Sequence, residues 1–407
     1  MKRKSNTGLY LGICVIVAVI VYLLLPNKPN PWRGLRERKP EAVLHTIEGL
    51  AQGSYYRVSY FDDVTVAEAA EAVAAETEGA VEAAAAGAAT ETAAVEAAAT
   101  TGTTGAAGVA AAEAARETAL RHSIDSLLRA FDLRFSLWED SSLLCRVNRN
   151  EDPILDAMFI DLFGKAVLAS EWTDGAFDIT VAPLVKAYGF AKEAVRGHRL
   201  SAGCRDSLLA RVGYAKASLQ GNRLVKQHPD LQLDFNAIAQ GYCADLVAGF
   251  LESRGLHRYL VDIGGEMRLK GLKNDGAPWQ IAIEQPADDA TASRQIYHTI
   301  PLTDASIVTS GNYRKYFEEN GRRFSHTISP KTGEPVRDSL LSATVICANA
   351  WEADAMATAF MVMGLAGTQR YLEAHPDRYE VFLIYARSDG SKILPDRRFG
   401  LWTNRPE

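Results

Sequence analysis

Residues 66–118 constrain the fold more than any other stretch, because their composition leaves almost nothing to bury. They consist mostly of Ala, Glu, Thr and Gly; no Lys or Arg occurs between Arg57 and Arg116, and no aromatic residue between Phe61 and Phe131. Ala and Glu favour helix, but a helix here would have no stripe of large apolar side chains with which to dock. We therefore expect a solvated low-complexity insertion, disordered or partly helical, and a core built from the sequence on either side.

The first 45 residues are also expected to lie outside the core. Three basic residues precede an uncharged stretch at residues 8–25, which as a helix would be about 27 Å long, just enough to cross a bilayer. No small-residue cleavage site stands out, so we expect an uncleaved signal-anchor there, after a cytoplasmic N-terminus at residues 1–7. A linker at residues 26–45 then leads to a folded domain at residues 46–400. Basic residues on both sides of the span leave its orientation nearly undecided.

The bulk composition argues against several function classes. The 407 residues carry a net charge of −6 and no Lys/Arg-rich run, which argues against a nucleic-acid partner. A hydrophobic content of 47% and a charged content of 23% are ordinary for a globular protein. Five cysteines are scattered without a C-x-x-C pair, so neither a disulfide framework nor a zinc site is supported. We interpret them mainly as small buried hydrophobic residues.

Hydrophobic periodicity predicts an α+β fold of antiparallel sheets packed with helices, since strands and helices do not alternate regularly. Apolar residues recur at helical spacing over 120–131, 158–172 and 237–254, and Gly255 is suited to end the third of these helices. Another helix is expected after Asn349. Strands are expected at residues 55–60, 231–235, 259–270, 279–284 and 341–347.

Two separated segments carry the most suggestive chemistry. The run at 231–235 breaks at Asn236 and enters a helix, and the backbone N–H groups at a helix start suit a diphosphate. About 120 residues later, Asp354 and Thr358 stand four apart on a predicted helix, so that a carboxylate and a hydroxyl share one face. Such oxygen donors suit one Mg²⁺ ion, which usually keeps waters and takes phosphate oxygens as further ligands. From spacing alone, the alternative is a helix-surface acid beside a hydroxyl at the edge of the core.

His326 is the candidate for proton transfer. Imidazole titrates near neutral pH, and residues with turn chemistry follow directly at 329–333. A lone histidine is usually structural, so the sequence by itself leaves that alternative open. The same is true of Asp234, which suits a ligand contact or a helix cap, and of Trp138, which suits stacking on a ligand or packing in the core.

Taken together, these residues resemble the ApbE-type FAD:protein FMN transferases. The resemblance covers residues 50–385 apart from the low-complexity insertion. It implies a two-lobed domain that transfers the FMN half of FAD to a Thr or Ser hydroxyl of another protein. A phosphoester forms, AMP leaves, and Mg²⁺ is required. The motifs that carry the resemblance lie at residues 51–56, 135–138, 175–180, 234–242, 309–313, 325–333 and 353–358.

The resemblance implies roles for individual residues at the reacting diphosphate. His326 would take the proton of the acceptor hydroxyl, and Asp354 would be the cation ligand on which catalysis depends. The metal would be held by the backbone carbonyl of Ala237 and by the side chains of Asp354 and Thr358. The Ala357 position would help in the same way as Ala237.

The resemblance also implies contacts with FAD, and three positions depart from the common pattern. Gln52 stands where relatives often carry Met, Gln240 where they often carry a charged residue, and Ser329 where they often carry Asp. An amide still forms hydrogen bonds, but a role that needs charge is in doubt at Gln240. The FAD-binding residues implied are Gln52, Trp138, Ala176, Phe177, Asp178, Asp234, Gln240 and Ile328, with 175–178 as a tight turn near the adenine end.

Two alternatives share most of these features. One is an Mg²⁺-dependent FAD pyrophosphatase that yields FMN and AMP, with water in place of the acceptor hydroxyl. The other is a non-catalytic, membrane-tethered FAD-binding protein. For the transferase, the implied partner is an acceptor with an Asp-Gly-x-Thr-like segment, in a membrane redox complex subunit or a flavin-carrier domain. With the anchor, this implies a single-pass protein of the inner (cytoplasmic) membrane whose catalytic domain lies on the periplasmic side.

Overall fold

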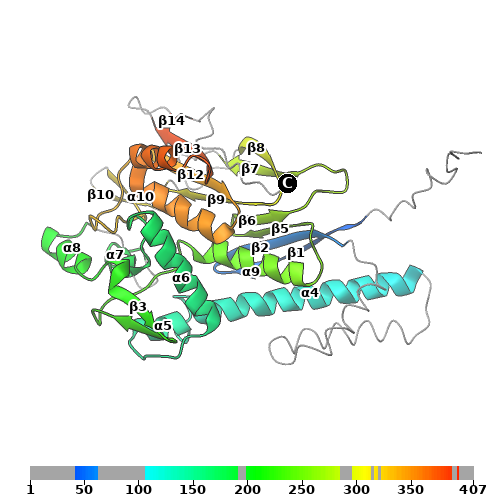
Figure 1. Ribbon diagram of the computed structural model, residues 1–407, viewed down its shortest axis with the longest axis horizontal. Helices are drawn as coiled ribbons and strands as arrows, with labels where there is room; N and C mark the ends of the chain where they lie inside the picture. The colour runs from blue at the N-terminus through cyan, green and yellow to red at the C-terminus, as the bar shows by residue number, and fades with distance from the viewer. Residues whose placement is uncertain are drawn as a thin grey trace, which may run out of the picture. The chain divides into compact units, whose positions relative to one another are not determined.

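Antiparallel hairpins supply most of the strands in this fold (Figure 1). The computed structural model describes residues 42–62, 106–190, 199–284, 296–312, 316–319, 322–386 and 392–393. Its strands are β1 (Leu44–Ala51), β2 (Ser54–Phe61), β3 (Ala217–Gln220), β4 (Arg223–Lys226), β5 (Tyr259–Ile263), β6 (Glu266–Lys270), β7 (Trp279–Glu284), β8 (Ile296–Leu302), β9 (Ala305–Gly311), β10 (Tyr316–Glu319), β11 (Arg322–Ser325), β12 (Leu340–Cys347), β13 (Glu380–Ala386) and β14 (Lys392–Ile393). Its helices are α4 (Ala106–Phe135), α5 (Leu143–Asn148), α6 (Ala157–Trp172), α7 (Ala182–Ala187), α8 (Ala202–Leu209), α9 (Ala239–Ser253) and α10 (Ala350–Ala374), with short 3-10 helices η1 (Ile179–Val181) and η2 (Tyr214–Lys216).

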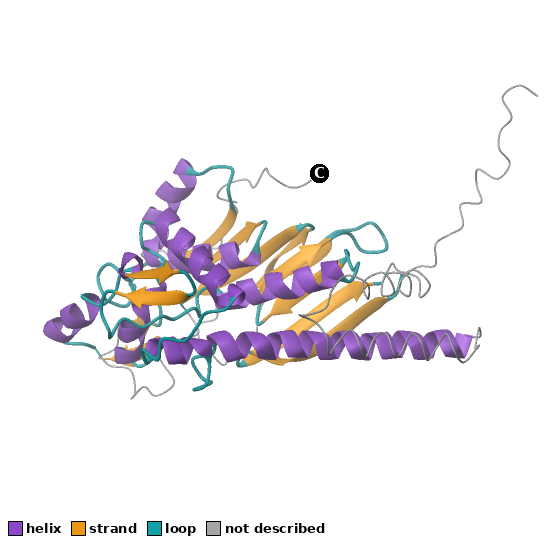
Figure 2. Ribbon diagram, turned by 60° about the horizontal axis from the view of Figure 1, so that its bottom comes forward, coloured by secondary structure: helices purple, strands orange, loops and turns teal. Residues whose placement is uncertain are grey.

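The main sheet has eight strands in the order β1-β2-β5-β6-β9-β12-β13-β14, each paired antiparallel with its neighbours. Helices α9 and α10 pack against each other and against the central strands: α9 on β5 and β6, α10 on β9 and β12. The long helix α4 runs beside the edge strand β1 (Figure 2). The α+β class with antiparallel sheets and packed helices is therefore confirmed.

Most predicted elements are found close to their expected positions. The helices expected at 158–172 and 237–254 are α6 and α9, and Gly255 follows α9 with a φ of +75°, as a helix-ending glycine should. The strands expected at 55–60, 279–284 and 341–347 are β2, β7 and β12. The segment at 259–270 is a hairpin of two strands rather than one run.

Helix α4 begins 14 residues before the predicted start at residue 120, inside the expected insertion. Polar contacts at Arg116 and Glu117 join the end of this extra part to the residues of the first hairpin and its flank. Arg116 Nη1 donates to Asp62 Oδ2 at 2.5 Å, and Glu117 lies 3.4 Å from His45. Residues 66–105 of the expected insertion lie outside the described residues.

The strand expected at 231–235 is wrong. The apolar alternation is real, because Leu231, Leu233 and Phe235 are buried, but no strand forms there. The side-chain amide of Asn148 takes the place of a partner strand: Leu233 N donates to Asn148 Oδ1 at 2.8 Å, and Asn148 Nδ2 donates to the Leu233 carbonyl at 2.9 Å. Residue patterns within one segment cannot reveal such a partner.

The described residues from Val43 onward belong to one compact unit, so the contacts do not separate the two lobes that the resemblance implied. The expected anchor at 8–25 and nearly all of the linker lie outside the described residues. Among the residues that are described, none forms a helix with the length and apolar character needed to span a bilayer. The cysteines in this part are free thiols: Cys243 and Cys347 are buried, Cys145 is half-buried, and Cys204 is exposed, contrary to the interpretation as a buried residue.

Candidate active site

The first turns of α9 and α10 are in direct contact, which brings the two chemistry-bearing segments together. Gly241 N donates to Asp354 Oδ2 at 3.0 Å. A Cβ atom at Gly241 would lie 2.2 Å from the Ala350 carbonyl oxygen and 2.7 Å from Asp354 Cβ. Only a glycine permits this approach, which sets Asp354 against the start of α9.

Asp354 supplies a hydrogen-bond acceptor that α9 lacks. The N-cap of α9 is Ile238, whose side chain accepts nothing, so the N–H of Gly241 in the first turn needs another partner. Asp354 is only 5% exposed. Burial raises its pKa above the ordinary range, and the hydrogen bond from Gly241 acts in the opposite direction. A buried carboxylate with so few partners suits a bound cation.

The other predicted metal ligands are Thr358 and Ala357 on α10 and Ala237, four residues before Gly241, whose N–H contacts Asp354. Thr358, one turn further along α10, has its Oγ1 3.2 Å from Ser310 Oγ at the end of β9. Ala237 lies half-buried in the turn before α9. Ala357 is fully buried in the hydrophobic cluster around Met356 and offers only its backbone carbonyl, which a regular helix uses internally.

This donor set fits Mg²⁺. A carboxylate, a hydroxyl and a backbone carbonyl are all hard oxygen ligands. The described segments contain no group of three or more His, Cys, Asp or Glu side chains arranged to bind a metal. A cation at Asp354 would therefore complete its coordination with waters and phosphate oxygens, as Mg²⁺ commonly does.

His326 lies directly after β11 and is linked to the same region. Thr327 Oγ1 donates to Asn312 Oδ1 at 2.6 Å, and Asn312 lies two residues beyond Ser310, the neighbour of Thr358. The His326 ring meets Phe190 edge-on, with centroids 6.3 Å apart. The next residue but one, Ile328, is buried and bridges to Pro335. The hairpin of β10 and β11 thus leads directly into His326 and Ile328, beside the end of β9 where Ser310 contacts the candidate metal ligand Thr358.

Asp234 stabilises the turn before α9 rather than the helix itself. Its Oδ1 accepts from Asn236 N at 2.8 Å, and its own N–H donates to the Ile179 carbonyl at 2.7 Å. Burial raises the pKa of Asp234, and the bond from Asn236 acts against that rise. The alternative of a cap on the following helix is therefore wrong, because Ile238 begins α9 without any side-chain cap.

Asp178 is already satisfied by protein groups. Its Oδ1 accepts from Thr180 N and Oγ1 at 2.8 and 2.6 Å, and its Oδ2 accepts from Tyr214 N at 2.8 Å. Burial raises its pKa despite these bonds. The carboxylate therefore organises the loop that follows α6. Any contact between Asp178 and FAD would have to share these acceptors.

The tight turn expected before Asp178 is present. Asp174 and Gly175 both have left-handed φ values, +49° and +71°, and Ala176 and Phe177 are buried behind them. Lys331 Nζ forms an ion pair with Asp174 Oδ2 at 2.5 Å. This pair connects the turn after α6 to the turn that follows His326.

The side-chain amide of Gln52 is buried without a hydrogen-bond partner in the part of the chain that the structure describes. It occupies the β1–β2 turn with a φ of +52°, and neither its Oε1 nor its Nε2, both buried, has a hydrogen-bond partner among the described residues. The Cys243 thiol lies beside it, but a thiol is too weak a partner to satisfy an amide. Buried amides are nearly always paired, so this one fits a ligand that brings polar atoms.

Two further predicted contacts differ in their surroundings. Gln240 points toward Gly264, where a Cβ atom would lie 2.4 Å from its Nε2, so the bare glycine leaves room for the amide. Trp138 is 61% exposed, which excludes the core as its place.

Two residues important to this arrangement were not assigned individual roles from the sequence: Gly241 and Ser310. A glycine within the predicted helix was the available signal for a close approach, since glycine is costly there. The partner of Ser310 comes from a distant segment, and no local pattern identifies it.

Replacing Gly241 with Ala should lower the free energy of unfolding by about 1–3 kcal/mol, the usual cost of overpacking. The clashing atom is a backbone oxygen of α10, which cannot rotate away. Chemical denaturation measures the change. Gly249→Ala is the matched control on the same helix, because nothing lies within 4 Å of a Cβ there. Equal effects of the two substitutions would contradict the close approach.

Comparison with known proteins identifies the family of this chain. The ApbE family profile matches residues 101–383. An FAD:protein FMN transferase of Vibrio cholerae is 37% identical over 288 residues, which cover 70% of this chain and 85% of that protein. The Escherichia coli K12 protein of the same name is 36% identical over 295 residues, covering 70% of this chain and 82% of its own length.

Solved structures agree with the sequence relatives. The flavin transferase ApbE from Vibrio cholerae superposes with a TM-score of 0.66 at 29% identity, covering 87% of this chain and 98% of that one. The apo form of the Pseudomonas stutzeri flavinyl transferase ApbE gives a TM-score of 0.66 at 28% identity, covering 87% and 95%.

Proposed function

Because the chain belongs to the ApbE family and is an FAD:protein FMN transferase, we propose that it forms a phosphoester on a Thr or Ser hydroxyl in an Mg²⁺-dependent reaction. The FMN half of FAD goes to the acceptor protein, and AMP leaves. The P–O bond to the acceptor oxygen forms as the P–O bond to AMP breaks. The hydroxyl proton must go to a base.

The contact between Asp354 and the first turn of α9 is the observation that carries the proposal. It places a buried carboxylate, with Thr358 one turn away, at the starts of two helices whose N-terminal ends favour anions. A bound Mg²⁺ would offset the charge that develops on the diphosphate oxygens. We assign its ligation to Asp354, Thr358 and the carbonyl of Ala237.

The remaining residues would bind and orient the reactants. His326, carried by the hairpin beside the end of β9, would take the proton of the acceptor hydroxyl. The orphaned amide of Gln52 would donate to and accept from the flavin. Lys331, now paired with Asp174, stands on the turn after His326 and would add positive charge near the phosphates.

One assay with the full chain tests the proposal. The protein is incubated with FAD, Mg²⁺ and an acceptor protein that carries an Asp-Gly-x-Thr-like segment, then denatured. We expect flavin fluorescence on the acceptor, and none on an acceptor whose Thr is replaced by Ala or when EDTA replaces Mg²⁺. Free FMN and AMP without labelled acceptor would favour the pyrophosphatase, and unchanged FAD a binding protein.

We also propose a location and a class of partner. The uncharged stretch at 8–25 would anchor the chain in the inner membrane, with the catalytic domain on the periplasmic side. Acceptors there would be subunits of membrane redox complexes or flavin-carrier domains. Fractionation of cells with a C-terminal tag and protease accessibility of intact spheroplasts would test this topology.

A further inference from the structure

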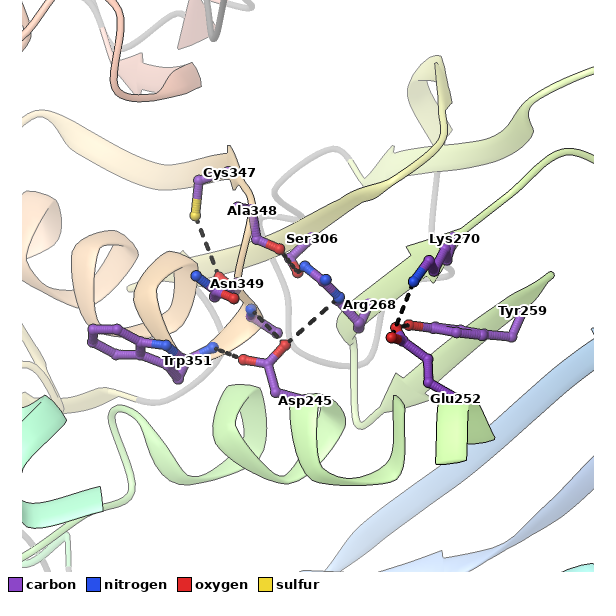
Figure 3. A network of polar contacts seen from close by, with 11 residues as sticks. Asp245, Glu252, Tyr259, Arg268, Lys270, Ser306, Cys347, Ala348, Asn349 and Trp351 are labelled. Atoms are coloured by element: carbon purple, nitrogen blue, oxygen red, sulfur yellow. Dashed lines mark hydrogen bonds and ion pairs between the residues drawn. The ribbon is translucent and has the colours of Figure 1, made fainter. Parts of the chain in front are cut away.

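Helix α10 takes its N-terminal cap from another helix. Its N-cap residue, Asn349, makes no side-chain capping bond. Instead, Asp245 of α9 accepts from Ala350 N at 3.0 Å through Oδ1 and from Trp351 N at 2.9 Å through Oδ2 (Figure 3). Ala350 is fully buried and Trp351 nearly so, which limits replacement of this carboxylate by water.

The arrangement is reciprocal. Asp354 of α10 accepts from Gly241 N in the first turn of α9, as Asp245 of α9 accepts from the first turn of α10. Asp245 lies about one turn beyond Gly241 on α9, and Asp354 lies about one turn beyond Ala350 on α10. Each helix therefore lacks its own capping side chain and receives one from its neighbour. Two such bridges at one crossing restrain both sliding and rotation of α10 against α9.

A basic residue holds the Asp245 carboxylate in place. Arg268 of β6 has its Nε 3.9 Å from Asp245 Oδ1, and its Nη1 donates to Ser306 Oγ at 3.3 Å. Ser306 Oγ in turn donates to the carbonyl of Ala348, just before α10, at 3.2 Å (Figure 3). The carboxylate is thus fixed relative to the sheet as well as to both helices.

The charge state of Asp245 suits this role. Burial raises its pKa to about 6, while the two N–H donors and Arg268 act in the opposite direction. At neutral pH the group is therefore mostly ionised and can accept both hydrogen bonds.

We infer that Asp245 is a positioning residue for the metal site: it holds the first turn of α10 against α9 and so sets where the Asp354 carboxylate lies. This inference rests on the proposed function, because it takes Asp354 to be the cation ligand. Asp245 itself is not among the proposed metal ligands, and it contacts the N–H groups of Ala350 and Trp351 and the Arg268 side chain. Its removal should weaken metal binding more than it weakens FAD binding.

The test measures cation affinity directly in the full chain, with FAD present and no acceptor. Mn²⁺ replaces Mg²⁺ as the probe, and free Mn²⁺ is counted by electron paramagnetic resonance. Asp245→Ala should raise the Kd for Mn²⁺ by at least about tenfold, as loss of an outer residue that orients a metal ligand commonly does. Asp245→Asn keeps one acceptor oxygen and should give a smaller rise. The Kd for FAD without metal should stay within about twofold of wild type, since Asp245 orients the metal ligand Asp354 and not the FAD contacts.

Glu252→Gln is the matched control. Glu252 lies on the same helix but pairs with Lys270 and Tyr259 instead of α10. The Glu252→Gln variant should therefore bind Mn²⁺ with the Kd of the wild type. If Asp245→Ala binds Mn²⁺ as tightly as the wild type, the inference about Asp245 is overturned but the proposed metal site is not. If Asp245→Ala does not fold, wild-type Mn²⁺ affinity in Asp245→Asn overturns it equally. Failure of the wild type to bind Mn²⁺, or unchanged binding in Asp354→Ala, would overturn the proposed metal site and this inference with it.

Discussion

Asp354→Ala should lower the rate of covalent flavin transfer by at least ~100-fold, corresponding to about 3 kcal/mol of lost transition-state stabilisation. The carboxylate is the only side chain among the assigned ligands that carries charge. Without it, nothing at this position holds the cation against the developing charge of the diphosphate. The measurement is the initial rate of flavin fluorescence appearing on the denatured acceptor at saturating FAD and Mg²⁺.

The control for Asp354→Ala must separate chemistry from stability. Removing this carboxylate also leaves Gly241 N without its acceptor, which should cost about 0.5–2 kcal/mol of folding free energy, as loss of a helix cap does. Chemical denaturation of the variant shows whether it is folded under assay conditions. Glu373→Ala, an exposed acid near the far end of α10, should change neither quantity. Near-normal turnover of folded Asp354→Ala would reject its role as the cation ligand.

His326→Ala should lower transfer by about 10²–10⁴-fold, the range typical of losing a general base. The acceptor hydroxyl must lose a proton as its oxygen attacks phosphorus, and His326 stands on the hairpin that borders the candidate metal ligands. FAD binding, measured by quenching of flavin fluorescence, should change little. Imidazole added to the buffer should restore part of the activity of this variant if the missing group is a base.

The matched control for His326 is His298→Ala. His298 is exposed on β8 and contacts Phe382, with ring centroids 6.3 Å apart, well separated along the chain from the predicted site residues. Its loss should leave transfer unchanged. A His326→Ala variant that retains wild-type transfer would return this histidine to a structural role.

Local sequence patterns predicted most of the helices and strands, but not all of the contacts that hold these segments in place. The periodicity of α6 and α9, the stop at Gly255 and the tight turn expected at 175–178 follow from residue preferences within a few positions. The structure confirms the helices and the stop, and it places the turn around Asp174 and Gly175. The error at 231–235 has a different origin. Leu233 satisfies both of its backbone groups with the amide of Asn148, a residue 85 positions away, and no preference of the segment itself encodes that partner.

The same division applies to the candidate site. Residue type and spacing singled out Asp354, Thr358 and His326 as candidates but left structural alternatives open, because a carboxylate, a hydroxyl or an imidazole can also have a structural role. Only the family resemblance implied their catalytic roles and that of the Ala237 carbonyl. The roles of Gly241 and Asp245 could not be found in this way. Their importance depends on distant groups that lie close to them. These are Asp354 Oδ2 and the Ala350 carbonyl oxygen at Gly241, and the Ala350 N–H at Asp245.

The sequence by itself therefore determined the fold class and the donor atoms available for catalysis, since these depend on local periodicity and side-chain chemistry, and its motifs carried the family resemblance. Only the tertiary structure decided that α9 and α10 cap each other through Asp245 and Asp354. The physical reason is that helix ends leave N–H groups unpaired, and which acceptor satisfies them is settled by packing between segments far apart in the chain.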